Sequence, residues 1–141
     1  MISKNKKIAL CALLTALLLA IMLFTLLPSY FITPIKKYIH IKTGHKLAYF
    51  TLTALLVFIF RVTTKYTSCF IYCISLLLAT GFGALLEVGQ RFTLTREGNI
   101  KDVVINFMGG VIAICVCFVC ELLYTGIKHL KILYKNRRIR T

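Results

Sequence analysis

Acidic residues are scarce in this chain: of its 141 residues, four are Asp or Glu, against 18 Lys or Arg, and the formal net charge is +14. In a soluble protein this imbalance would suggest nucleic acid as a partner. Here the basic residues lie between and beyond long apolar stretches, where positive charge sets membrane topology. We therefore expect no nucleic acid partner. The hydrophobic content of 59%, above the roughly 45–50% of soluble domains, indicates an integral membrane protein.

The chain also lacks an internal repeat and a low-complexity linker, so we predict a single transmembrane domain over residues 1–141. No small-x-small cleavage site follows the first apolar run, residues 8–27, which is longer than the signal-peptide core of about 7–15 residues. We interpret this run as a retained first span. All six cysteines fall inside apolar stretches. We interpret them as packing thiols rather than metal ligands, and we expect neither a metal nor a cofactor.

Four apolar segments approach the roughly 20 residues that a helix needs to cross a bilayer. They cover residues 8–27, 44–60, 67–90 and 103–124. The predicted fold class is therefore all-α, a polytopic membrane bundle of four transmembrane helices. A further re-entrant or interfacial segment within residues 28–43 stays open, because the aromatic and apolar residues at positions 30–32 could lie in the membrane interface.

Positive charge is more abundant in the N-terminal segment, the 61–66 loop and the tail after Tyr124 than in the two other loops. The positive-inside rule then places both termini in the cytoplasm and the 28–46 and 91–102 loops outside. Residues 125–141 become a basic cytoplasmic tail, in which each charge would gain about 1 kcal/mol at an anionic membrane surface.

Polar side chains mark one face on each of the last three predicted spans, near the same end of the bundle. Residues three or four apart on a helix lie above one another, so each set shares a face. The sets are His45 and Tyr49 on the second span, Gly83, Glu87 and Gln90 on the third, and Asp102, Asn106, Gly109 and Ala113 on the fourth. We expect the three faces to converge on a common pocket, since ionisable groups are costly to keep near hydrocarbon.

An architectural plug is the alternative, in which Glu87 and Asp102 pair with Arg91, Arg96 or His45 and lock the helices together. Such interactions contribute about 0.6–2 kcal/mol each in membranes. The two remaining acids are expected outside the site. Glu97 lies in a short polar turn, and Glu121 either snorkels or pairs with Lys128 near the basic tail.

The ordered set of motifs resembles the VanZ-like family of small bacterial membrane proteins over residues 42–113. It consists of Lys42-x-x-His45-x-x-x-Tyr49, then Glu87-x-x-Gln90, and then Arg96, Asp102, Asn106 and Gly109. The resemblance implies several helices in the cytoplasmic membrane of a Gram-positive bacterium. It also implies an association with resistance to glycopeptide antibiotics, teicoplanin in particular. Ile41 departs from the pattern, because the family often has Asp before its motif lysine.

Two functions follow as expectations. In the first, the protein binds a lipid-linked cell-wall component, another membrane lipid or a lipoglycopeptide antibiotic without catalysis. Arg96 would hold an anion. The other ligand-binding candidates are Lys42, Tyr49, Gln90, Asp102 and Asn106. In the second, a membrane-embedded enzyme acts on a lipid head group or phosphate ester, with His45 and Glu87 as the catalytic acid–base pair. Transport ranks below both, because no inverted repeat is visible; an oligomer is possible.

Overall fold

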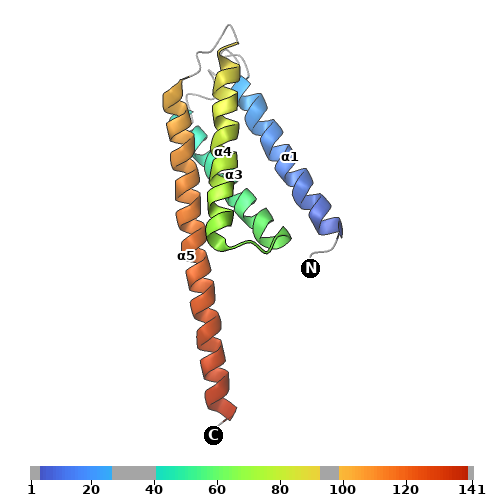
Figure 1. Ribbon diagram of the computed structural model, residues 1–141, viewed down its shortest axis with the longest axis vertical. Helices are drawn as coiled ribbons and strands as arrows, with labels where there is room; N and C mark the ends of the chain where they lie inside the picture. Colours follow the sequence, from blue (N-terminus) through green and yellow to red (C-terminus); the bar gives the residue numbers. More distant parts are fainter. Residues whose placement is uncertain (1–3, 27–40, 93–98, 140–141) are drawn as a thin grey trace.

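The computed structural model describes residues 4–26, 41–92 and 99–139, and every regular element in these ranges is an α-helix (Figure 1). The helices are α1 (Lys4–Leu26), α3 (Ile41–Thr63), α4 (Ser68–Gln90) and α5 (Ile100–Ile139). The predicted all-helical class is confirmed for this part of the chain. The segment 28–43, for which a re-entrant element stayed open, lies almost wholly outside the described residues.

Three of these helices are long and apolar enough to cross a membrane. The spans are Thr43–Thr63 in α3, Ser68–Gln90 in α4 and Ile100–Ile132 in α5. The apolar part of α1, Ile8–Leu23, is shorter than the roughly 20 residues of a full span. Three spans are thus supported by length and composition, and the fourth, through α1, stays a prediction.

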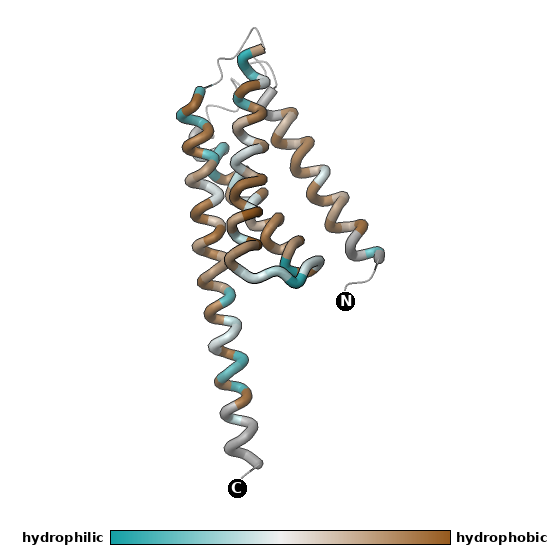
Figure 2. Tube along the Cα trace, viewed as in Figure 1, coloured by the Kyte–Doolittle hydropathy of each residue, from teal (hydrophilic) through white to brown (hydrophobic). Residues whose placement is uncertain are grey.

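Helix α5 is longer than the predicted span 103–124, because it begins at Ile100 and continues through the basic tail to Ile139. Its 40 residues extend for about 60 Å at 1.5 Å per residue, roughly twice the thickness of the hydrocarbon core. The C-terminal half therefore projects beyond the other helices (Figure 1). Along this projection, hydrophilic and hydrophobic residues alternate, whereas the bundle part of α5 is mainly hydrophobic (Figure 2).

Helices α3, α4 and α5 form a tight bundle because glycines bring their backbones together. A Cβ atom on Gly109 of α5 would clash with the main-chain carbonyl of Lys46 on α3. A Cβ atom on Gly110 would lie 2.6 Å from Leu76 Cδ1 on α4 and 3.0 Å from Thr53 Oγ1 on α3. Small residues at helix contacts are the usual means of close packing in membranes.

The buried core cluster is formed by apolar side chains from α1, α3 and α4, and Ala113 of α5 is also buried. Ile21 of α1 lies in one buried cluster with α3 and α4 residues, and further α1 side chains pack against it. Its other buried members are Tyr49, Leu52, Leu56, Ala79 and Leu86. Large apolar side chains such as Leu77 and Leu85 are exposed on the outside, as expected of a lipid-facing surface.

The cysteines also lie mainly on this outer surface. Cys117 is half-buried, and the five others, Cys11, Cys69, Cys73, Cys115 and Cys120, are exposed; all six are free thiols. These exposed thiols lie where lipid or another chain would surround them, so their interpretation as packing thiols stays a prediction. They occupy faces of the helices that no other described helix covers, and there they serve as small apolar groups in contact with the surroundings.

Candidate functional site

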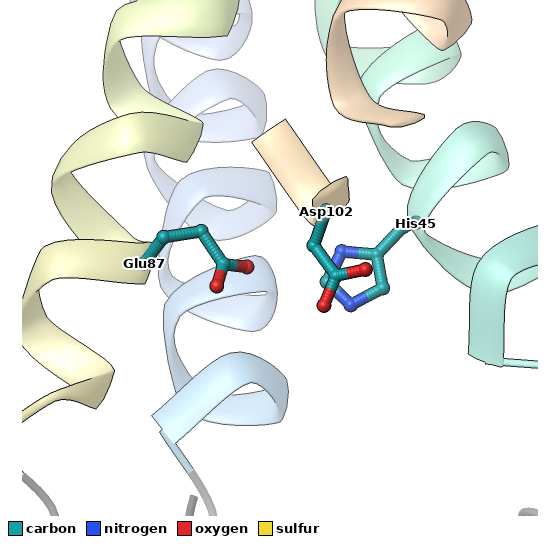
Figure 3. Close-up of side chains that lie close together, drawn as sticks. All are labelled: His45, Glu87 and Asp102. Atoms are coloured by element: carbon teal, nitrogen blue, oxygen red, sulfur yellow. The ribbon is translucent and has the colours of Figure 1, made fainter. Parts of the chain in front are cut away.

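Three ionisable side chains from three different helices meet at one end of the bundle (Figure 3). A ring nitrogen of His45 on α3 and a carboxylate oxygen each from Glu87 on α4 and Asp102 on α5 all lie within 4.8 Å of one another. We call these three residues the outer cluster. The three polar faces thus converge, as predicted; that they enclose a common pocket stays a prediction.

The positions of these residues along their helices explain why they meet. His45 lies in the second turn of α3, Glu87 in the last turn of α4 and Asp102 in the first turn of α5. Helix α4 runs antiparallel to its two neighbours, so its end and their beginnings lie at the same end of the bundle (Figure 1). Side chains one turn from these ends are therefore brought to one level.

A close helix contact directly below the outer cluster sets its spacing. Gly83 lies one turn before Glu87, and a Cβ atom there would be 2.9 Å from Asn106 Nδ2 and 2.9 Å from Tyr49 Cε1. Tyr49 and Asn106 are each only 2% exposed. The missing side chain of Gly83 thus provides the room that these two buried side chains occupy.

Asn106 orients the imidazole of His45. Its Oδ1 lies 3.1 Å from His45 Nδ1, and an amide oxygen only accepts hydrogen bonds. Nδ1 of His45 therefore carries a proton and donates it, which leaves Nε2 as the ring nitrogen available to a ligand or a proton. The Nδ2 atom of Asn106 is buried and has no hydrogen-bond partner among the described residues.

Glu87 is only 5% exposed and joins the end of α4 to the start of α5. Its Oε2 accepts a hydrogen bond of 3.0 Å from the main-chain N–H of Asn99. Asn99 in turn begins α5, because its side-chain Oδ1 accepts from Lys101 N at 3.0 Å and its carbonyl from Asp102 N at 2.8 Å. This role of Asn99 was not predicted, although an Asn immediately before the first helical residue, here Ile100, is a common N-cap signal.

Of the other polar residues considered in the sequence, some are buried near the outer cluster, one is exposed, and some lie outside the described structure. Tyr49 and Gln90 are buried on the faces that carry His45 and Glu87, so they are close in helix position to the outer cluster, and Gln90 is engaged in an interaction. Lys42 lies in the first turn of α3, but its side chain is not described. Arg96, the predicted anion clamp, lies outside the described residues, as does Glu97. Arg91 is exposed just after α4.

A second polar cluster joins the same three helices at their other end. Glu121 of α5 forms an ion pair with Arg61 of α3. It also accepts hydrogen bonds from Tyr72 Oη at 2.6 Å and from Ser68 Oγ at 3.1 Å, both on α4. The predicted pairing of Glu121 with Lys128 is therefore wrong. Arg61 was predicted to follow a span, but α3 continues to Thr63, and this extra turn brings the guanidinium to Glu121.

The two clusters differ in chemistry. In the second, the Glu121 carboxylate already accepts from Arg61, Tyr72 and Ser68, and the Arg61 guanidinium lies 5.4 Å from the centre of the Tyr72 ring. The outer cluster combines two carboxylates with one imidazole whose Nε2 is free of the Asn106 contact. Such a set can accept hydrogen bonds from hydroxyl or ammonium groups, transfer a proton, or bind a cation.

The chain matches a known protein family. A family model described as VanZ/LLP1 matches residues 4–122. The matched stretch is longer than the expected 42–113, since it also includes α1 and most of the bundle part of α5. It thus contains both the outer cluster and the cluster around Glu121. No curated protein and no solved structure matches the chain.

Proposed function

Because the chain belongs to the VanZ/LLP1 family, we propose that it acts in the cell envelope of a Gram-positive bacterium as a multi-pass protein of the cytoplasmic membrane. It contributes there to resistance against teicoplanin and related lipoglycopeptides by binding a lipid-linked envelope component or the drug itself. The observation that carries this proposal is the outer cluster, in which His45, Glu87 and Asp102 come together from three helices.

The location of the cluster supports a role on the outer side of the membrane. The C-terminal projection of α5 carries basic residues and leaves the bundle at the end opposite to the outer cluster (Figure 1). The positive-inside rule assigns this basic end to the cytoplasm. The outer cluster then lies at the external boundary, where lipid-linked cell-wall precursors expose their head groups and where glycopeptides act.

The donor and acceptor groups suit a polar head group. The carboxylates of Glu87 and Asp102 accept hydrogen bonds from hydroxyl, amide or ammonium groups of a sugar or peptide. Arg96 remains the proposed contact for an anion, and Lys42 remains a further ligand-binding candidate. A lipid tail would lie against the exposed apolar faces of the bundle, where residues such as Val88 face outward. Binding alone would require neither Glu87 nor Asp102 to change its protonation state.

A membrane-embedded enzyme is the second candidate, and the hydrogen bond from His45 to Asn106 favours it. This bond fixes the tautomer of the imidazole and leaves Nε2 to exchange a proton with a substrate, with Glu87 and Asp102 close by. A histidine held in this way, near carboxylates, is a typical general acid–base arrangement. The reaction would be a transfer or hydrolysis at a lipid head group or phosphate ester.

Teicoplanin susceptibility of a sensitive Gram-positive host tests the proposal. The host expresses the wild type, Glu87→Gln, His45→Ala or Arg96→Ala, with the amount in the membrane measured for each. Cys69→Ser serves as a matched control, because it also changes one heavy atom of an α4 side chain but lies on the exposed surface. We expect the wild type and the control to raise the inhibitory concentration.

The variants separate the two candidates. If the protein only binds, Glu87→Gln retains part of the protection, since an amide still accepts a hydrogen bond, and Arg96→Ala loses most of it. If it is an enzyme, Glu87→Gln and His45→Ala each abolish protection at normal abundance. A wild type that gives no protection would refute the resistance function, and full protection by all three variants would make the outer cluster architectural.

A further inference from the structure

We propose that the outer cluster binds one divalent transition-metal ion, such as Zn²⁺ or Mn²⁺, through His45, Glu87 and Asp102. No metal was expected, because the three residues are distant in the chain and form no ligand motif. In the folded protein they offer one imidazole nitrogen and two carboxylate oxygens within 4.8 Å of one another. A mixed nitrogen and oxygen set of this kind suits Zn²⁺ or Mn²⁺ better than Ca²⁺, which takes six to eight oxygens.

The ligands can reach the distances that a metal requires. Zn²⁺ binds imidazole nitrogen and carboxylate oxygen at about 2.0–2.2 Å, so neighbouring ligand atoms around it lie roughly 3.0–3.5 Å apart. From separations of at most 4.8 Å, the ligand atoms would approach one another by about 1–2 Å when the ion binds, through rotation of the three side chains. Glu87 reaches toward the other two from one side, while the Asp102 carboxylate lies beside the His45 ring (Figure 3). The remaining coordination positions would be filled by water or by a ligand.

Asn106 gives independent support, because it holds the imidazole of His45 in the way that metal-bound histidines are usually held. Metal-bound histidines almost always donate their second ring N–H to a carbonyl or carboxylate, which fixes the ring. Here Asn106 Oδ1 accepts from His45 Nδ1 at 3.1 Å. Asn106 is only 2% exposed, and its Nδ2 has no hydrogen-bond partner among the described residues.

The unpartnered Nδ2 of Asn106 indicates that this side chain serves to orient His45. A buried amide that serves packing would be expected to satisfy both ends of its dipole. Asn106 instead directs its oxygen at His45 and leaves its nitrogen against the space created by Gly83. The hydrogen bond from His45 to Asn106 Oδ1 therefore orients the imidazole. With the ring held in this way, Nε2 is positioned as a ligand atom before a metal binds.

The charges of the cluster point the same way. Glu87 is buried and Asp102 is half-buried, and two neighbouring carboxylates repel each other unless a proton or a cation lies between them. A divalent ion satisfies both oxygens and the lone pair of Nε2 at once. It would also convert a cluster that repels phosphate into one that attracts it. The attraction of a phosphate head group rests on the proposed function. The binding of the metal does not, because it can be measured in the absence of any lipid.

The experiment uses the full chain, purified in detergent with a tag that contains no histidine. The protein is stripped with a chelator, dialysed, and titrated with Zn²⁺ by calorimetry. Bound metal per chain is then counted by mass spectrometry after gel filtration. We expect one ion per wild-type chain, and at least a tenfold loss of affinity in Asp102→Asn and in Glu87→Gln. His45→Ala should bind no ion at this site.

Two further variants separate a built site from surface binding and from loss of fold. His129→Ala is the matched control, because it removes another histidine, exposed on the projection of α5, and should leave binding unchanged. Asn106→Leu keeps all three ligands but removes the acceptor for Nδ1, so we expect a tenfold to hundredfold loss of affinity. Circular dichroism and the elution volume confirm that each variant is folded.

A spectroscopic measurement on the wild type covers the case in which the ligand variants do not fold. The Mn²⁺-loaded protein should show an electron paramagnetic resonance signal of bound ion that one equivalent of Zn²⁺ displaces. The inference is overturned if the wild type binds no ion above the level of His45→Ala, or if binding disappears in His129→Ala and persists in folded Asp102→Asn. Metal binding without teicoplanin protection would refute only the proposed function; protection without metal binding would refute only the metal site.

Discussion

His45 Nδ1 on α3 donates a hydrogen bond of 3.1 Å to Asn106 Oδ1 on α5, and this bond links two residues that are 61 positions apart. It explains two features of the outer cluster together. The imidazole is held with Nε2 free, and a polar side chain is tolerated in the bundle core although its Nδ2 has no partner among the described residues. The pair therefore connects helix packing to the chemistry of the cluster.

Asn106→Leu should separate these two contributions. Leucine has nearly the shape of asparagine and removes the unpartnered Nδ2, so the loss of the hydrogen bond to His45, worth about 0.5–1.5 kcal/mol, is largely offset. We expect a melting temperature close to that of the wild type, together with loss of teicoplanin protection, because His45 is no longer oriented. Thermal unfolding in detergent and susceptibility assays check this. A variant that melts far below the wild type would instead assign Asn106 a structural role.

Gly83→Ala should loosen the bundle beneath the outer cluster. The new Cβ would lie 2.9 Å from Asn106 Nδ2 and 2.9 Å from Tyr49 Cε1, so at least one buried side chain must move. Overpacking of this kind typically costs about 1–3 kcal/mol. The measurement is the unfolding midpoint of the purified protein in detergent.

Gly81→Ala is the matched control, since it lies on the same helix and a Cβ atom there meets nothing within 4 Å in the described structure. It should be neutral or stabilise α4 by up to about 1 kcal/mol, the difference in helix propensity between alanine and glycine. Equal effects of the two substitutions would contradict the close contact at Gly83.

Much of the bundle and of the outer cluster could be predicted because both depend on local patterns. Apolar runs of about 20 residues identify spans, and spacings of three and four residues assign His45 with Tyr49, and Glu87 with Gly83, to single faces. Antiparallel connections then bring these faces to one end. The carboxylates near His45 come from α4 and α5, so the apolar Ile41 does not deprive the cluster of acids.

The length of α5 and the partner of Glu121 could not be predicted from the spacing of residues in the sequence. Basic residues after Tyr124 end a membrane span because charges leave hydrocarbon, but they do not end a helix. Lysine, leucine and isoleucine favour or tolerate helix, so α5 continues to Ile139. The partner of Glu121 depends on how far α3 extends, and one more turn places Arg61, 60 positions away, nearer in space than Lys128.

The ion pair between Arg61 and Glu121 should contribute little to stability, even though it joins two helices. Both side chains are about one-third exposed, at 31% and 35%, and exposed pairs contribute about 0–1 kcal/mol. A double-mutant cycle with Arg61→Gln and Glu121→Gln should give a coupling of about 0.6 kcal/mol. Lys128→Gln should leave stability unchanged in both the wild-type and Glu121→Gln backgrounds. Coupling of Glu121 to Lys128 rather than to Arg61 would contradict this assignment.

Reporter fusions should place the two ends of the bundle on opposite sides of the membrane. A fluorescent protein that folds only in the cytoplasm should be bright when fused after Thr141 and after Lys65, in the connection between α3 and α4. It should be dark after Asn99, which precedes α5. The reason is the excess of basic residues on the projection of α5. A bright fusion after Asn99 would move the outer cluster to the cytoplasmic side and would contradict its proposed contact with external head groups.

Gly109→Ala should be the most damaging of the single-methyl substitutions, because the new Cβ meets backbone and not a movable side chain. The contact is the main-chain carbonyl of Lys46, with the Lys46 carbonyl carbon and Cα each at 3.1 Å. Helices α3 and α5 must separate, which would widen the outer cluster between His45 and Asp102. We expect destabilisation near the upper end of the roughly 1–3 kcal/mol range for overpacking, together with weaker Zn²⁺ binding.

Gly126→Ala on the same helix is the control. A Cβ atom there meets nothing within 4 Å in the described structure, so this variant should match the wild type in both measurements. If Gly109→Ala melts at the wild-type temperature and binds Zn²⁺ normally, the close approach of α3 and α5 does not set the geometry of the outer cluster.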